Sequence, residues 1–142
     1  MKIYELVHMH GAEVLSDGRF HYGDIATLGF FKSFDDVSAA IEHYKNIVGF
    51  RNYPNGFVVF EHEIEGDAAN IYVAFFYIHD EAYEFEYSRN LGIFPCESDA
   101  CQAVKTFQQN NFINWDGDKR IAEFGVDNYV LGEMNCTDGF DF

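Results

Sequence analysis

The chain reads LGFFKSFDDVSAAIEHY from Leu28 to Tyr44, and it reads LGIFPCESDACQAVKTF from Leu91 to Phe107. The two stretches start 63 positions apart, and both have leucine, glycine and phenylalanine at their first, second and fourth positions. An internal repeat fixes the architecture of a chain, so it is considered before other motifs. We therefore predict a single domain, residues 1–142, made of two related halves at approximately 1–67 and 68–142.

The second part of each stretch has the apolar spacing of an amphipathic helix. Apolar residues recur at i, i+3, i+4 and i+7, which places them on one stripe of a helix and leaves the other face polar. Ser33 stands three residues before Asp36, as an N-cap does. We predict that each helix packs on a sheet through these residues: Val37, Ala40, Ile41 and Tyr44 in the first half, and Ala100, Ala103, Val104 and Phe107 in the second.

Stretches rich in β-branched and aromatic residues flank each predicted helix. We expect strands at 3–10, 19–31 and 57–64 in the first half, and at 71–78, 83–94 and 129–134 in the second. The order is therefore strand, strand, helix, strand, repeated once. This order predicts an α+β fold of two ββαβ repeats, with a mainly antiparallel sheet and two helices packed on one of its faces.

The charge balance is strongly acidic. Twenty-four Asp and Glu residues against nine Lys and Arg residues leave a formal net charge of -15. This charge argues against nucleic acid as a partner, because phosphates require the opposite sign. A protein with a basic surface is the natural complement. The alternative is that acidity only keeps a chain with 18% aromatic residues soluble.

Glutamates alternate with apolar or aromatic residues in two predicted strands. Side chains alternate between the two faces of a strand, so each set of glutamates shares one face. The first set is expected opposite a core-facing set of Phe60, His62 and Ile64. We predict an acidic, partner-binding face that includes Glu61, Glu63, Glu65, Glu84 and Glu86.

The single tryptophan, Trp115, lies in a turn-rich loop of the second half. Buried aromatic side chains supply much of the affinity at many protein interfaces. We therefore add Trp115, with the neighbouring Asp116 and Asp118, to the predicted partner-binding residues.

Catalytic motifs are weak in this chain. His8 and His10 share a strand face and could hold a metal, so a small metal-dependent enzyme is one alternative. The sequence contains no GxSxG elbow, P-loop or GxGxxG motif. Cys96, Cys101 and Cys136 form no CxxC pair and are interpreted as free thiols. We predict a protein that is not an enzyme, with no catalytic residues, no metal and no cofactor.

The first residues have no apolar stretch of signal-peptide length, and no segment of the chain approaches the length of a membrane helix. We expect a cytoplasmic protein without a membrane partner.

Five segments of the chain resemble a small bacterial domain. They are YELVH at 4–8, LGFFKS at 28–33, AAI at 39–41, GFRNYPNGF at 49–57 and the acidic tail TDGF at 137–140. The resemblance covers most of the first half and only the tail of the second. Small acidic bacterial proteins of this kind include the immunity proteins of polymorphic toxin systems, such as contact-dependent growth inhibition.

The resemblance implies an inhibitor that binds a cognate protein toxin and covers its active site. Where the toxin is a nuclease, its cleft is basic, and carboxylates on a rigid sheet would stand in for the phosphates of its substrate. A phage-type inhibitor that mimics DNA would have the same acidity. The sequence leaves the identity of the toxin and the choice between these two inhibitors open.

Overall fold

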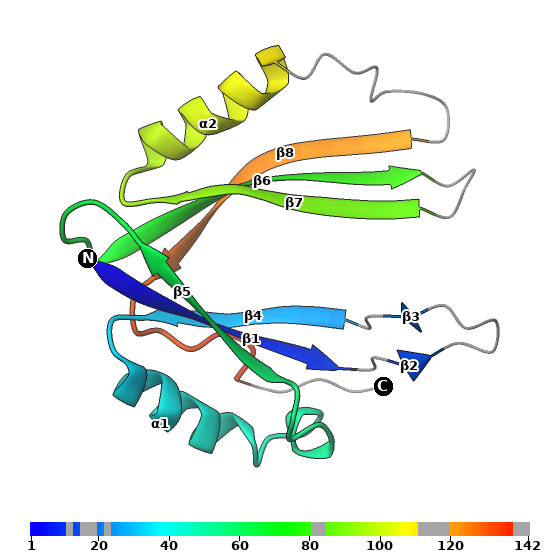
Figure 1. The fold of residues 1–142 in the computed structure, drawn as a ribbon, viewed down its shortest axis with the longest axis vertical. Coiled ribbons are helices and arrows are strands. Elements are labelled where there is room, and N and C mark those ends of the chain that lie inside the picture. The colour runs from blue at the N-terminus through cyan, green and yellow to red at the C-terminus, as the bar shows by residue number, and fades with distance from the viewer. Residues whose placement is uncertain (11–12, 15–19, 22–23, 81–84, 111–119, 138–142) are drawn as a thin grey trace. The chain divides into compact units, whose positions relative to one another are not determined.

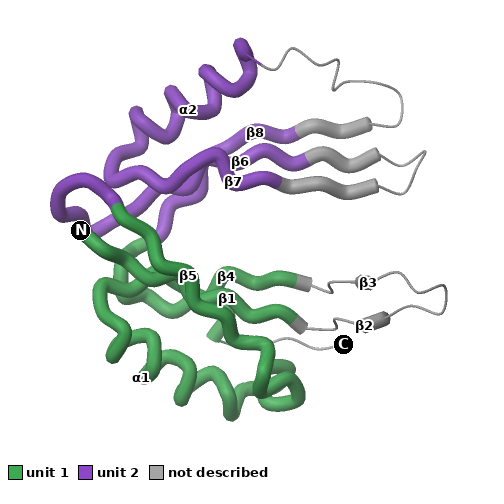
Figure 2. The backbone as a smooth tube through the Cα atoms, in the orientation of Figure 1, with its two compact units in different colours: residues 1–63, 130–142 green, residues 64–129 purple. Residues whose placement is uncertain are grey.

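The computed structural model of the protein describes residues 1–10, 13–14, 20–21, 24–80, 85–110 and 120–137 (Figure 1). The contacts within the chain define two compact units, and the second is inserted into the first (Figure 2). The first unit comprises Met1–Glu63 and Val130–Phe142, and the second comprises Ile64–Tyr129. The division near residue 64 lies close to the predicted boundary at 67, whereas residues from 130 onward belong to the first unit.

The first unit contains a three-stranded antiparallel sheet in the order β4-β1-β5. Its helix, α1, packs against β1 and β4. A short 3-10 helix, η1, precedes β5, and β2 pairs with β3 in a separate two-stranded ladder. The bounds are β1 (Lys2–His10), β2 (Glu13–Val14), β3 (Phe20–His21), β4 (Asp24–Phe31), α1 (Phe34–Tyr44), η1 (Phe50–Asn52) and β5 (Phe57–Glu63).

The second unit repeats this arrangement. Its three-stranded sheet has the order β7-β6-β8, so the first strand of the unit is again central, and α2 packs on β6 and β7. The bounds are β6 (Asn70–Asp80), β7 (Phe85–Phe94), α2 (Glu97–Asn110) and β8 (Arg120–Val130). The predicted α+β class and ββαβ order are confirmed. Apart from the β2–β3 ladder, the described strands form two three-stranded sheets, each with its own helix, and not one continuous sheet.

A β-bulge occurs at equivalent places in the two hairpins. The register of β1 with β4 leaves Leu28 without a cross-strand partner, and the register of β6 with β7 does the same for Leu91. These leucines are the first residues of the two repeated stretches. A glycine follows each leucine, Gly29 in the first hairpin and Gly92 in the second. The ring of the phenylalanine two residues after that glycine packs over it. A shared irregularity of this kind supports the interpretation of the chain as a duplicated unit.

The amphipathic stripe of α1 faces the sheet as predicted. Val37, Ala40 and Tyr44 are buried and form a core cluster with residues of β1 and β4. Ser33 caps the helix, because its Oγ accepts a hydrogen bond from the backbone N–H of Asp36 at 3.1 Å.

In α2 only Ala100 is fully buried among the four predicted stripe positions. Ile41 and Val104, which occupy equivalent positions, are both partly buried. Both therefore lie at the border of the buried stripe, and the predicted packing on the sheet is only partial at this pair.

The last strand lies earlier in the chain than the sequence analysis placed it. β8 covers Arg120–Val130, so the predicted strand at 129–134 begins where the actual strand ends. The residues after Val130 instead run along β4. Gly132 N–H donates to Phe30 O at 2.8 Å, and Asn135 N–H donates to Leu28 O at 2.7 Å. Residues 132–135, which we call the C-terminal segment, thus cover the outer edge of β4.

Within the described residues, no helix is long and apolar enough to cross a membrane.

Candidate functional site

His8 lies in the interior of the first unit. It is fully buried, and its ring contacts the rings of Phe50 and Phe57 with centroid distances of 4.9 and 4.8 Å. Its Nε2–H donates to the backbone carbonyl oxygen of Tyr53 at 3.0 Å. The hydrogen on Nε2 means that this nitrogen has no lone pair for a metal in this arrangement. His8 therefore has the surroundings of a structural histidine that fastens the loop before β5 to the sheet.

The second unit has an aromatic cluster in the corresponding place. Phe76 of β6, 68 positions after His8, stacks on Phe107 at the end of α2 with ring centroids 4.7 Å apart. Phe124 of β8 lies 5.9 Å from Phe76. The correspondence of His8 with an apolar ring favours a packing role over a chemical one. The side chain of His10 lies outside the described residues, and the described His, Cys, Asp and Glu residues form no group of three that could hold a metal.

The predicted acidic residues of β5 are exposed, but two of them already have cationic partners. Glu61 accepts a salt bridge from Lys2 Nζ at 2.6 Å, and Glu63 lies 3.5 Å from the N-terminal amino group. The hydrogen bond and charge of Glu61 raise the pKa of Lys2. Glu65 is also exposed and follows the end of the strand. Because Lys2 and the amino terminus offset two of the three charges, the local field is weaker than the sequence alone suggests.

The two faces of β5 are arranged differently from the prediction. Phe57 and Val59 pack against the core beneath α1. Glu61 lies on the same face of the strand, so this face is apolar at one end and acidic at the other. Phe60, predicted to face the core, is 43% exposed. His62 is partly buried and pairs with Glu5, with 2.9 Å between Nε2 and Oε1. Both faces of β5 therefore carry apolar and polar residues.

Most of the other predicted partner-binding residues cannot be placed. Glu84, Trp115, Asp116 and Asp118 lie outside the described residues. The backbone of Glu86 lies in β7 opposite His79, but its side chain is outside the described part of the chain. The structure thus brings Glu61 and Glu63 together on one strand and does not test whether the remaining residues join them.

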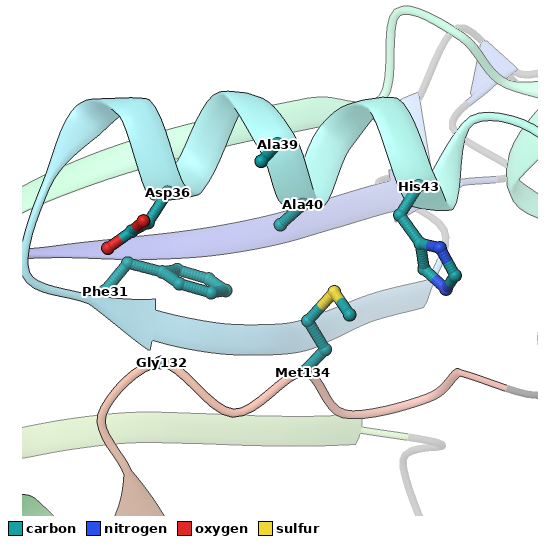
Figure 3. A pocket seen from close by; sticks show the side chains of 7 residues that line it. All are labelled: Phe31, Asp36, Ala39, Ala40, His43, Gly132 and Met134. Atoms are coloured by element: carbon teal, nitrogen blue, oxygen red, sulfur yellow. The ribbon is translucent and has the colours of Figure 1, made fainter.

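A shallow pocket of about 340 Å³ lies between α1 and the C-terminal segment. Figure 3 shows Phe31 and Met134 between Asp36 and His43, which stand at opposite ends of the pocket. Asp36 and His43 lie seven positions apart in α1, a rise of about 10 Å along the helix, and their side chains stand apart in the pocket. The complete lining is Phe31, Asp36, Ala39, Ala40, His43, Gly132 and Met134.

The sequence does not predict this pocket, because two of its seven lining residues come from the segment that was expected to form the last strand of the second half. The pairing of Gly132 and Met134 with a helix nearly 90 residues earlier leaves no local pattern in the sequence. Only Gly132, two residues after the end of β8 and with a positive φ of 89°, marks the turn that starts the C-terminal segment.

Comparisons with protein family models, with curated proteins and with solved structures gave no match to the chain.

Proposed function

We propose that this protein is a non-enzymatic inhibitor that binds and neutralises a cognate bacterial toxin, as an immunity protein does. The observation that carries the proposal is the net charge of -15 on a folded chain of 142 residues. Such an excess of carboxylates attracts a basic protein surface and accelerates association with it. The resemblance of the first half to small acidic bacterial proteins points to the same class.

The exposed end of β5 is the part of the described surface that suits this role best. Glu61, Glu63 and Glu65 project from a strand that is paired with β1 along its whole length, or from the residues directly after it. The backbone that carries Glu61 and Glu63 is already ordered by its pairing with β1, so binding costs little main-chain entropy there. Phe60, exposed on the opposite face of the same strand, offers an additional aromatic contact.

The first experiment tests function. The gene immediately upstream is examined for a toxin-like domain, the protein is co-expressed with the domain encoded there, and growth and complex formation are measured. The proposal predicts restored growth and a stable complex of the two chains. If the protein forms no complex with that domain, and instead binds a DNA-binding protein in competition with DNA, the phage-type DNA mimic replaces the immunity protein.

The second experiment tests the electrostatic mechanism. In the variant Glu61→Lys, Glu63→Lys, Glu65→Lys, association with the partner should slow by at least about tenfold at low salt, and its dependence on salt should weaken. The matched control carries the same change of charge on α1 and β8, as Glu42→Lys, Glu123→Lys, Asp127→Lys, at residues that are also exposed. Equal on-rates for the two variants would mean that only net charge matters, and an unchanged on-rate in both would remove electrostatic attraction from the proposal.

A further inference from the structure

The two edges of the first sheet differ. The outer edge of β4 is covered by the C-terminal segment, which donates hydrogen bonds to Leu28 O and Phe30 O. The outer edge of β5 forms no backbone hydrogen bond with any other described segment. An uncovered edge presents a row of N–H and C=O groups that can pair with a further strand.

The hydrogen-bond pattern shows which residues point outward from β5. Met9 N–H donates to Gly56 O at 2.8 Å, which sets the alternation along the antiparallel pair of β1 and β5. Val58, Phe60 and His62 therefore direct their backbone groups toward β1. Their neighbours Phe57, Val59, Glu61 and Glu63 direct theirs toward the open edge.

An independent bond supports this assignment. Phe30, opposite Glu5 across the other side of β1, directs its carbonyl oxygen away from β1 and toward Gly132. The backbone N–H and C=O of Glu5 must therefore form hydrogen bonds with β5, where Glu5 is opposite Phe60. The same alternation follows from both sides of the sheet.

The β5 edge lacks most of the features by which proteins block an open strand. Its register with β1 is continuous over seven residue pairs, without a bulge. It contains no proline and no lysine. The charged side chains of β5 that flank its outward backbone groups are Glu61 and Glu63, and both are negative, although Lys2 and the N-terminal amino group lie against them. These charges oppose pairing with an acidic strand and favour pairing with a basic one.

We infer that the β5 edge receives an extended, basic segment of the protein partner as an added strand, with Lys or Arg side chains beside Glu61 and Glu63. The inference rests on the proposed function for the existence of a protein partner. A second copy of this chain is a poor occupant, because it would bring the same glutamates and another net charge of -15 to the edge. The salt bridge of Glu61 with Lys2 does not prevent the contact, since a carboxylate accepts several hydrogen bonds.

The direct test uses a seven-residue peptide with blocked ends, in which lysine alternates with valine. A control peptide has the same composition with all lysines in one block. Amide hydrogen exchange of the isotope-labelled protein is followed by NMR with each peptide at millimolar concentration. The alternating peptide should slow exchange at Val59 and Glu61 by at least about tenfold, and change Val58 and Phe60 little, because those amides already bond to β1. Equal effects of the two peptides, or binding without protection of Val59 and Glu61, would overturn the inference.

The second test uses the cognate partner and one position. Glu61→Pro removes the outward N–H of the strand and keeps the ladder with β1, because a proline is tolerated on the free side of an edge strand. Glu61→Gln removes the same charge and keeps the N–H. After NMR spectra have established that both variants are folded, Glu61→Pro should weaken binding at least about tenfold more than Glu61→Gln. Equal affinities of the two variants would overturn the added strand and leave the toxin inhibitor intact.

If the unaltered protein binds no toxin, the proposed function fails, and the peptide test alone decides whether the edge accepts a basic strand.

Discussion

The hydroxyl group of Tyr44, the last residue of the first repeated stretch, donates a hydrogen bond to the carbonyl oxygen of Leu28, the first residue of that stretch, at 3.2 Å. The same hydroxyl group also contacts the carbonyl oxygen of Asn135. Tyr44 therefore joins the end of α1, the bulge of β4 and the C-terminal segment. Phe107 occupies the equivalent position in the second unit and has no hydroxyl group, which is consistent with the docking of this segment on the first unit.

Replacement of Tyr44 by phenylalanine should lower the free energy of unfolding by about 1–2 kcal/mol at pH 7. The ring remains in the core, but the carbonyl oxygens of Leu28 and Asn135 lose the hydroxyl hydrogen that they share. Urea unfolding followed by circular dichroism measures the change. Tyr72→Phe, at a partly buried tyrosine of β6, is the matched control and should cost less. Equal losses in the two variants would contradict the assigned role.

The stability of the protein should also depend on Tyr44 at high pH. Burial raises the pKa of Tyr44 to about 12, whereas a tyrosine in an unfolded chain titrates near 10. The unfolded chain therefore loses this proton first, and deprotonation favours unfolding as the pH rises from about 10 to about 12. The contribution is fully present below pH 10. Unfolding free energies measured across this range should fall less steeply for Tyr44→Phe than for the unaltered protein, and parallel curves would argue against the shifted pKa.

The helices and the repeat could be predicted from the sequence because both are recorded in local spacing. Val37, Ala40 and Tyr44 are buried at the positions that a helical period requires. The leucine and glycine that begin each repeated stretch mark the same bulge in both hairpins. Patterns of this kind can be read from the sequence because the role of each residue depends on neighbours close in the chain.

The position of the C-terminal segment and the faces of β5 could not be predicted in the same way. Tyr44 and Asn135 are 91 residues apart, and no local period links them. In β5 the residues Phe57–Phe60 are all apolar, so this part of the strand has no alternation that would show which set faces α1. The strand at 120–130 carried a readable alternation around Phe124, but the analysis placed the last strand later, where the chain actually turns at Gly132.

Gly29→Ala should loosen the C-terminal segment. A β-carbon at Gly29 would lie 2.7 Å from the backbone oxygen of Glu133, so the segment or the strand would have to move. We expect a loss of about 1–3 kcal/mol in unfolding free energy and faster amide exchange at Gly132 and Asn135. The control, Gly125→Ala, meets only the ring of Phe75, which can shift, and should leave exchange at these two amides unchanged.

His8→Ala should act on stability and not on partner binding. The substitution removes a fully buried ring and leaves a cavity among Phe50 and Phe57, at a cost of about 2–4 kcal/mol. Elemental analysis of protein purified without an affinity tag should find no stoichiometric metal. Stoichiometric zinc, iron or manganese that is lost in His8→Ala would instead favour the small metal-dependent enzyme.

Truncation of the chain separates the role of the C-terminal segment from that of the residues beyond it. A chain that ends at Val130 loses the hydrogen bonds to Leu28 O and Phe30 O and the contact of Met134 with the core. It should unfold more easily by about 2–4 kcal/mol and self-associate, because the β4 edge is then exposed. A chain that ends at Thr137 retains all of these contacts and is the matched control. Light scattering and urea unfolding compare the two chains, and equal behaviour would show that the segment neither covers the edge in solution nor stabilises the first unit.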